Sequence, residues 1–175
     1  MIVAGLDLSL CSTGLVAVPH TFAASIDWTT VRHTLVTSDA LPNGASVRER
    51  TGRLLAVATA ITRWIQAGPC DVIAIERQAY HMGHAHAREL GELTGITCAE
   101  LLALDVPIVM VTSSSARKTL LGTVPRSGAK DAVRDLLRRM GSPWADTDRS
   151  DAFAVANHAL SESGVPCVMS GRVAA

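Results

Sequence analysis

The sequence predicts an α/β protein built on a mixed β-sheet. Short runs typical of strands come early in the chain, and later runs alternate with segments whose apolar residues recur at helical spacing. The chain has 175 residues, 48 % of them hydrophobic, which is enough to bury a core. No repeat, linker or low-complexity tract divides it, so we expect a single domain over residues 1–175.

Five runs predict the strands. Residues 2–8 and 15–18 flank a turn rich in Ser, Thr and Gly, which is typical of a hairpin. The remaining strands are expected at residues 33–37, 71–76 and 106–112.

Five further segments predict helices. From Ala45 to Ile65, apolar residues recur at helical spacing with charged residues on the opposite face, and Gly68 and Pro69 end the segment. The other helices are expected at residues 84–104, 113–121, 128–140 and 148–163.

Charge and cysteine content exclude several classes of protein. The 16 basic and 16 acidic residues give no net charge, which excludes a basic tail-type binder and an acidic disordered chain. The four cysteines form no Cys-x-x-Cys pair, which argues against a zinc site or disulfide framework and favours a cytoplasmic protein. Residues 1–18 lack Lys and Arg and contain Asp7, so we expect neither a signal peptide nor a membrane span.

Four acidic residues form the most informative pattern in the chain. Asp7 and Glu76 each end a buried strand, and strand ends of neighbouring parallel strands meet at one edge of a sheet. Asp148 and Asp151 are three residues apart, so they project from one face of the last helix. Four carboxylates from three segments could therefore converge on Mg²⁺ or Mn²⁺, which prefer hard oxygen ligands.

Each acid also has a simpler interpretation. Asp148 alone is typical of a helix N-cap, and Asp151 alone of an acid favoured by the helix dipole. Asp7 alone could bond backbone amides of the following turn. The joint pattern favours the metal centre, where two ions about 4 Å apart would serve phosphodiester cleavage.

Five motifs in order resemble one known family. The segment GLDLSLCSTG at residues 5–14 resembles the opening of RuvC-type Holliday junction resolvases, whose pattern is G-I-D-P-G, three residues, then T-G. Ile75-Glu76 before a helix and Asp148-x-x-Asp151-Ala152 resemble the family's other acidic positions. Residues 116–122 and 128–133 resemble its two lysine-bearing segments, so the likeness extends over nearly the whole chain.

The resemblance implies an RNase H-like fold, with three antiparallel strands followed by parallel ones. It also implies a homodimer that nicks four-way DNA junctions in paired, symmetric fashion with Mg²⁺. Carried over by position, the metal ligands would be Asp7, Glu76, Asp148 and Asp151. Lys118 and Lys130 would contact DNA, with Lys118 also catalytic at the scissile phosphate.

Three departures from the family pattern indicate a divergent, phage-type member. Leu8 and Ser9 replace the Pro and Gly after the first acid. Asp148 stands where bacterial members often carry His. Ala79 replaces an aromatic residue, and Tyr80 beside it could stack on an unpaired base.

A basic segment at residues 113–140 predicts the DNA-binding face. Seven basic residues there are opposed by two acids, and we single out Arg117, Lys118, Arg126 and Lys130 as phosphate contacts. The alternative is a solvated helix with charge pairs three and four residues apart.

Two patterns near residues 81–99 remain open. His81, His84 and His86 could bind metal or DNA, or simply begin a helix. A stripe of small residues could form a two-fold dimer interface or pack against the protein's own sheet. Its members are Ala87, Gly91, Gly95 and Ala99.

The leading hypothesis is thus a junction-resolving endonuclease, with three alternatives. One is another RNase H-like nuclease acting on flaps, branches or RNA–DNA hybrids. A second is an ATP-binding module of the actin and sugar-kinase type, which normally needs a second subdomain and an adenosine motif that this chain lacks. A third is a non-catalytic junction-binding protein, which predicts missing acids.

Overall fold

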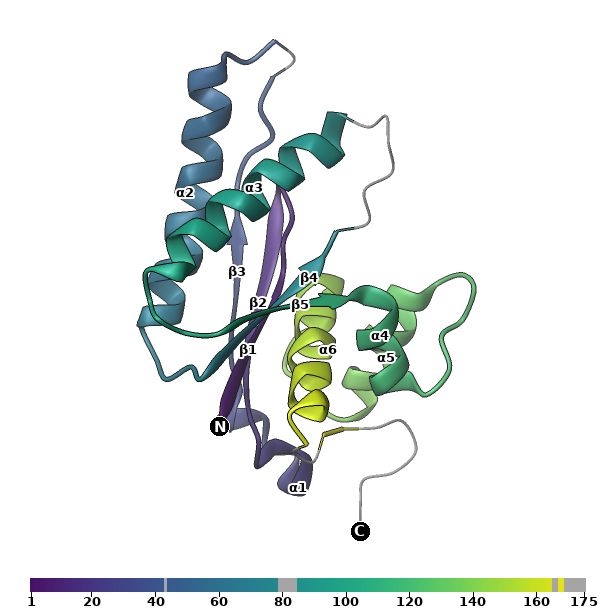
Figure 1. Cartoon of the computed structure of the whole chain (residues 1–175). Helices are drawn as coiled ribbons and strands as arrows, with labels where there is room; N and C mark the ends of the chain where they lie inside the picture. The colour runs from purple at the N-terminus through teal and green to yellow at the C-terminus, as the bar shows by residue number, and fades with distance from the viewer. Residues whose placement is uncertain (43, 79–84, 165–166, 169–175) are drawn as a thin grey trace.

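A five-stranded mixed sheet runs through the centre of the protein, with helices on both faces (Figure 1). The computed structural model describes all residues except 43, 79–84, 165–166 and 169–175. The strands are β1 (Ile2–Asp7), β2 (Ser12–Pro19), β3 (Arg32–Thr37), β4 (Val72–Arg77) and β5 (Ile108–Thr112). The helices are α1 (Phe22–Ser25), α2 (Val47–Gln66), α3 (Ala85–Leu102), α4 (Ser113–Leu121), α5 (Ala129–Arg139) and α6 (Thr147–Glu162).

The sheet has the strand order β3-β2-β1-β4-β5. The first three strands pair antiparallel, and β4 and β5 continue the sheet in parallel with β1. This arrangement confirms the predicted fold class. Because β1 and β4 are parallel neighbours, their carboxyl ends lie at the same edge. Leu6 pairs with Ile75, which places Asp7 next to Glu76 in the register.

Alternating side chains of the strands build two separate apolar layers. Val3, Ala74 and Val111 belong to a core shared with α4, α5 and α6. Leu6 and Ile75 belong to the opposite core, which is shared with α2 and α3. Figure 1 shows the two helical layers on either side of the sheet. Asp7 follows the alternation of Val3, so it faces the α6 side.

The segment between β2 and β3 contains two short elements that the sequence did not predict. They are α1 and a 3-10 helix at Trp28–Thr30. Phe22 from this segment packs against Phe153, and Trp28 packs against Trp144 and Phe153, with ring centroids 5.1 to 5.5 Å apart. The Trp28 indole also donates a hydrogen bond to the Met140 carbonyl at 2.7 Å. These partners lie more than 100 residues away in the chain, so local sequence could not indicate them.

Two glycines allow α6 to lie directly on the sheet. A Cβ at Gly5 of β1 would collide with the Ala152 carbonyl oxygen and would lie 2.7 Å from the Ala156 nitrogen. A Cβ at Gly14 of β2 would collide with the Asp148 carbonyl oxygen. The helix that carries Asp148 and Asp151 is therefore placed by the absence of side chains beneath it.

Replacing Gly5 by Ala is expected to destabilise the protein by about 1–3 kcal/mol, because the added methyl group meets rigid helix backbone. The free energy of unfolding in urea measures this effect. Gly52→Ala is the matched control, since Gly52 is an exposed residue of α2 with no atom within 4 Å of the added Cβ. That control is expected to gain about 0.5–1 kcal/mol from helix propensity. Equal stability of Gly5→Ala and wild type would contradict the close approach.

Among the residues that the structure describes, no helix has the length and apolar character needed to cross a bilayer.

Candidate metal centre

Three carboxylates from three segments meet at the carboxyl edge of β1 and β4. Asp7 ends β1, Glu76 lies near the end of β4, and Asp151 projects from the first turns of α6. One ligand atom from each side chain lies within 4.8 Å of the other two. The residues are only 6 %, 9 % and 2 % exposed, respectively. The structure thus brings together three of the four acids singled out in the sequence.

Asp148, the fourth acid, lies beside this cluster rather than within it. It is half-buried in the first turn of α6, and its charge helps to raise the pKa of Asp7. The simpler interpretation of Asp148 as the helix N-cap is wrong. The cap is Asp146, whose carboxylate accepts a hydrogen bond from the Arg149 backbone at 2.8 Å. The helix starts at Thr147, one residue earlier than the sequence predicted.

Burial and mutual repulsion raise the pKa values of two acids in the cluster, Asp7 and Glu76. Desolvation is the largest cause that raises the pKa of Asp7 from 3.8 to about 8, and the charge of Glu76 is the next. Burial and then the charge of Asp151 raise the pKa of Glu76 as well. Such acids are costly to ionise together unless a cation joins them.

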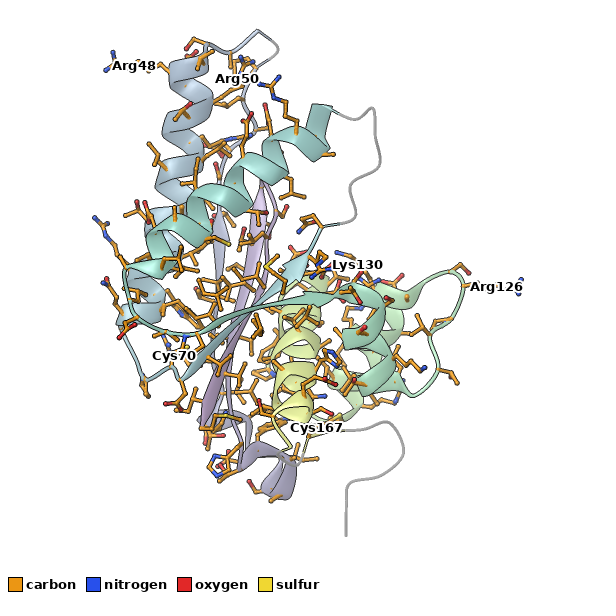
Figure 2. All side chains as sticks on the ribbon, in the orientation of Figure 1. Arg48, Arg50, Cys70, Arg126, Lys130 and Cys167 are labelled. Carbon is orange, nitrogen blue, oxygen red and sulfur yellow. The ribbon has the colours of Figure 1, made fainter. Side chains whose placement is uncertain are left out.

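Two basic side chains partly neutralise the cluster. Arg117 of α4 donates two hydrogen bonds to Asp151, from Nε to Oδ1 at 3.2 Å and from Nη2 to Oδ2 at 2.9 Å. The Lys130 ammonium, from the first turn of α5, lies 3.2 Å from Asp151 Oδ2 and 3.6 Å from Asp7 Oδ2. Figure 2 labels Lys130 beside the end of β4. The sequence had singled out both residues for DNA, not for these ion pairs.

The other residues singled out for DNA lie elsewhere. Lys118 is exposed on α4, one position beyond the residue that contacts Asp151. Arg126 extends from the loop between α4 and α5 (Figure 2). Tyr80 lies outside the described residues.

Several supporting contacts were not predicted. The Ser113 hydroxyl, at the start of α4, hydrogen-bonds to Glu76 and partly offsets the rise in the pKa of that carboxyl. The side-chain amide of Gln78 donates to the Leu8 carbonyl at 3.2 Å, which ties the ends of β1 and β4 together. Each residue directly follows a strand, a signal that sequence inspection could have used.

The donor set fits a divalent cation that prefers oxygen. All three ligand groups are carboxylates, which suit Mg²⁺ or Mn²⁺ better than zinc. Glu76 Oε2 is buried and has no hydrogen-bond partner in the part of the chain that the structure describes. A buried carboxylate oxygen without a partner is rare in folded proteins, and a bound cation would satisfy it.

The patterns at residues 81–99 have mixed outcomes. His81 and His84 lie outside the described residues, and His86 is exposed on α3. Of the small-residue stripe, Gly95 and Ala99 are exposed, and a Cβ at Gly95 would meet open space. Packing of the stripe against the protein's own sheet is therefore wrong for these two positions.

The strand order and the flanking helices form an RNase H-like fold, and the acidic cluster at its sheet edge is a candidate metal centre. No family model matches the chain. The structure of Thermus thermophilus RuvC in complex with Holliday junction substrate matches with a TM-score of 0.64 and 19 % identity, covering 95 % of this chain and 98 % of that one. The yeast mitochondrial Holliday junction resolvase Ydc2 matches with a TM-score of 0.54 and 14 % identity, covering 89 % and 76 %.

Two curated proteins are similar in sequence. Both are named crossover junction endodeoxyribonuclease RuvC, from Paenarthrobacter aurescens and Pseudarthrobacter chlorophenolicus. Each is 29 % identical over 107 residues, which is 59 % of this chain and 56 % or 55 % of the relative. The chain thus spans about half the length of the curated relatives it matches. These matches confirm the resemblance to RuvC-type resolvases.

Proposed function

We propose that this protein is a metal-dependent endodeoxyribonuclease that resolves four-way DNA junctions by paired, symmetric nicks. The observation that carries the proposal is the meeting of Asp7, Glu76 and Asp151 within 4.8 Å on this fold. The similar proteins are named as crossover junction endonucleases or were solved with a Holliday junction, which supports a four-way junction as the substrate. A metal centre built from buried acids also favours catalysis over a purely binding role.

The four acids have distinct roles in this proposal. Asp7, Glu76 and Asp151 would hold two cations, Mg²⁺ or Mn²⁺, and Asp7 would be the ligand that both ions share. Asp148 adds a ligand or negative charge from the same helix face. When bound, such a pair of ions activates a water and stabilises the leaving oxygen of a phosphodiester. The two Arg117 bonds hold Asp151 in a fixed orientation for this task.

The basic face beside the acids would contact DNA. Lys118 and Arg126 are exposed on and after α4, so their charges are free to approach phosphates. Arg117 and Lys130 lie closer to the acids and would approach the scissile phosphate, and Tyr80 would stack on an unpaired base. The catalytic basic residue assigned by resemblance was Lys118. The contact of Arg117 with Asp151 favours Arg117 for a role nearer the reacting atoms.

Two copies of the chain would act together, because symmetric nicks need two sites related by a dyad. The exposed Gly95 and Ala99 of α3, with Ala87 and Gly91, would form the contact between them. We assign residues 1–175 to one nuclease domain. The four cysteines are free, which supports a reducing compartment such as the cytoplasm of a bacterium or a phage-infected host.

A labelled synthetic junction tests the proposal. With Mg²⁺, the protein is expected to nick opposite strands of a four-way junction at symmetric positions, and to leave a linear duplex of the same sequence intact. EDTA is expected to abolish the nicks. Equal cleavage of the duplex, of a flap or of an RNA–DNA hybrid would replace junction resolution with a more general nuclease. Junction binding without any cleavage would contradict catalysis.

A further inference from the structure

The ammonium group of Lys130 occupies a specific place inside the acidic cluster. Its Nζ lies between Asp7 and Asp151, 3.6 Å and 3.2 Å from their Oδ2 atoms. The Lys130 side chain is 50 % exposed, whereas those of Asp7 and Asp151 are 8 % and 2 % exposed. A flexible cation thus reaches from solvent to two buried carboxyl groups.

Positive charge is unevenly distributed over the three acids. Both oxygens of Asp151 are bonded by Arg117, and Oδ2 also faces Lys130. Asp7 faces only Lys130 among the ion pairs of the described residues. Glu76 Oε2 is buried and has no hydrogen-bond partner there. Direct ion pairs therefore lie on the side of Asp7 and Asp151, whereas no ion pair of the described residues includes Glu76.

We propose that, in the DNA-free protein, the Lys130 ammonium occupies the second of the two cation positions, between Asp7 and Asp151. The position between Asp7 and Glu76 then binds one divalent ion tightly. The inference rests on the proposed function, because it assumes that the cluster holds divalent ions.

Elementary electrostatics supports the assignment of Lys130 to one cation position and of a divalent ion to the other. A divalent ion between Asp7 and Asp151 would need the same oxygens that now face the ammonium. Two cations cannot share so small a space without strong repulsion, so Lys130 must move before a second ion binds. A DNA phosphate offers Lys130 another partner of the same charge as a carboxylate. When DNA binds, Lys130 would thus move to a phosphate and leave the position between Asp7 and Asp151 free for a second divalent ion.

Counting bound Mn²⁺ tests the proposal without measuring activity. The free Mn²⁺ signal in electron paramagnetic resonance gives the number and affinity of ions on the DNA-free protein. Wild type is expected to bind one tight ion per chain. Lys130→Met is expected to bind two, the second at least tenfold more tightly than wild type binds its second ion. Lys130→Arg, which keeps the charge, is expected to bind one.

Arg48→Met is the matched control, since it removes one exposed positive charge from α2, which packs on the other face of the sheet. It is expected to leave the number and affinity of bound ions unchanged. Circular dichroism melts in EDTA report whether each variant is folded before titration, and Lys130→Gln replaces Lys130→Met if the latter is not.

Two tight ions on the wild type would overturn the proposal, and so would a Lys130→Met variant that binds only one ion with higher affinity. Both results leave the proposed metal centre intact. Failure of the proposed function differs, because neither wild type nor Lys130→Met would then bind Mn²⁺ at the cluster, and Asp7→Asn would leave the titration unchanged.

Discussion

Replacing Asp7 by Asn is expected to lower the rate of junction cleavage by at least about 10³-fold, because the central anionic ligand is lost from the site that stabilises charge in the transition state. Asn keeps the size of the side chain, so the fold should be preserved. Single-turnover cleavage of a labelled four-way junction in Mg²⁺ measures the effect. The affinity for the junction, measured by gel shift in Ca²⁺, should change little, since Asp7 lies among buried acids and not on the basic face.

Asp39→Asn is the control for this variant, because Asp39 is an exposed acid that follows β3, two strands away from β1. Cleavage by Asp39→Asn should equal that of wild type. An Asp7→Asn variant that retains more than about a tenth of the wild-type rate would remove Asp7 from the reaction, since a tenfold loss corresponds to only about 1.4 kcal/mol.

The metal-free protein is expected to lose stability as the pH rises from 6.5 to 8. The pKa of Asp7 is about 8 in the folded protein against 3.8 for an ordinary Asp, so the folded state keeps a proton that the unfolded chain has already lost. A carboxyl group of this kind contributes least to the free energy of unfolding when the pH is above the pKa that it has in the folded protein. The loss approaches about 1.4 kcal/mol per pH unit for one such group. Glu76 contributes in the same direction, because its pKa is also raised.

The pH range starts at 6.5 because His33 has the opposite effect on stability at lower pH. Burial, followed by the charge of Arg149, lowers the pKa of His33 below its ordinary 6.5, so His33 increases stability with rising pH only up to about that value. Urea unfolding in EDTA at pH 6.5 and 8 measures the slope. Asp7→Asn should show a smaller decrease, and Mn²⁺ should reverse the decrease in wild type. An identical slope in wild type and Asp7→Asn would contradict the burial of a proton on Asp7.

Strand periodicity predicted the part of the site that depends on the sheet. Asp7 and Glu76 could be placed together because each ends an apolar run, and adjacent parallel strands end at one edge. Asp151 could be added because helical spacing relates it to Asp148. The chemistry of the cluster followed from residue types alone.

The remaining features depend on the rotation and packing of individual elements. Arg117 and Lys118 are adjacent in the chain, and only the burial of Ala116 and Leu120 decides which of them faces Asp151. Asp146 and Asp148 are both plausible caps, and the start of α6 over Gly14 decides between them. The contact of Lys130 with the acids depends on how α5 packs on α6, which no local pattern encodes.

Anomalous diffraction from crystals grown with Mn²⁺ tests the metal centre most directly. We expect a manganese ion about 2.0–2.3 Å from carboxylate oxygens of Asp7 and Glu76. Any second ion is expected on the Asp151 side, with Lys130 then displaced. Manganese bound only at other sites, under conditions in which the protein cleaves DNA, would contradict the account.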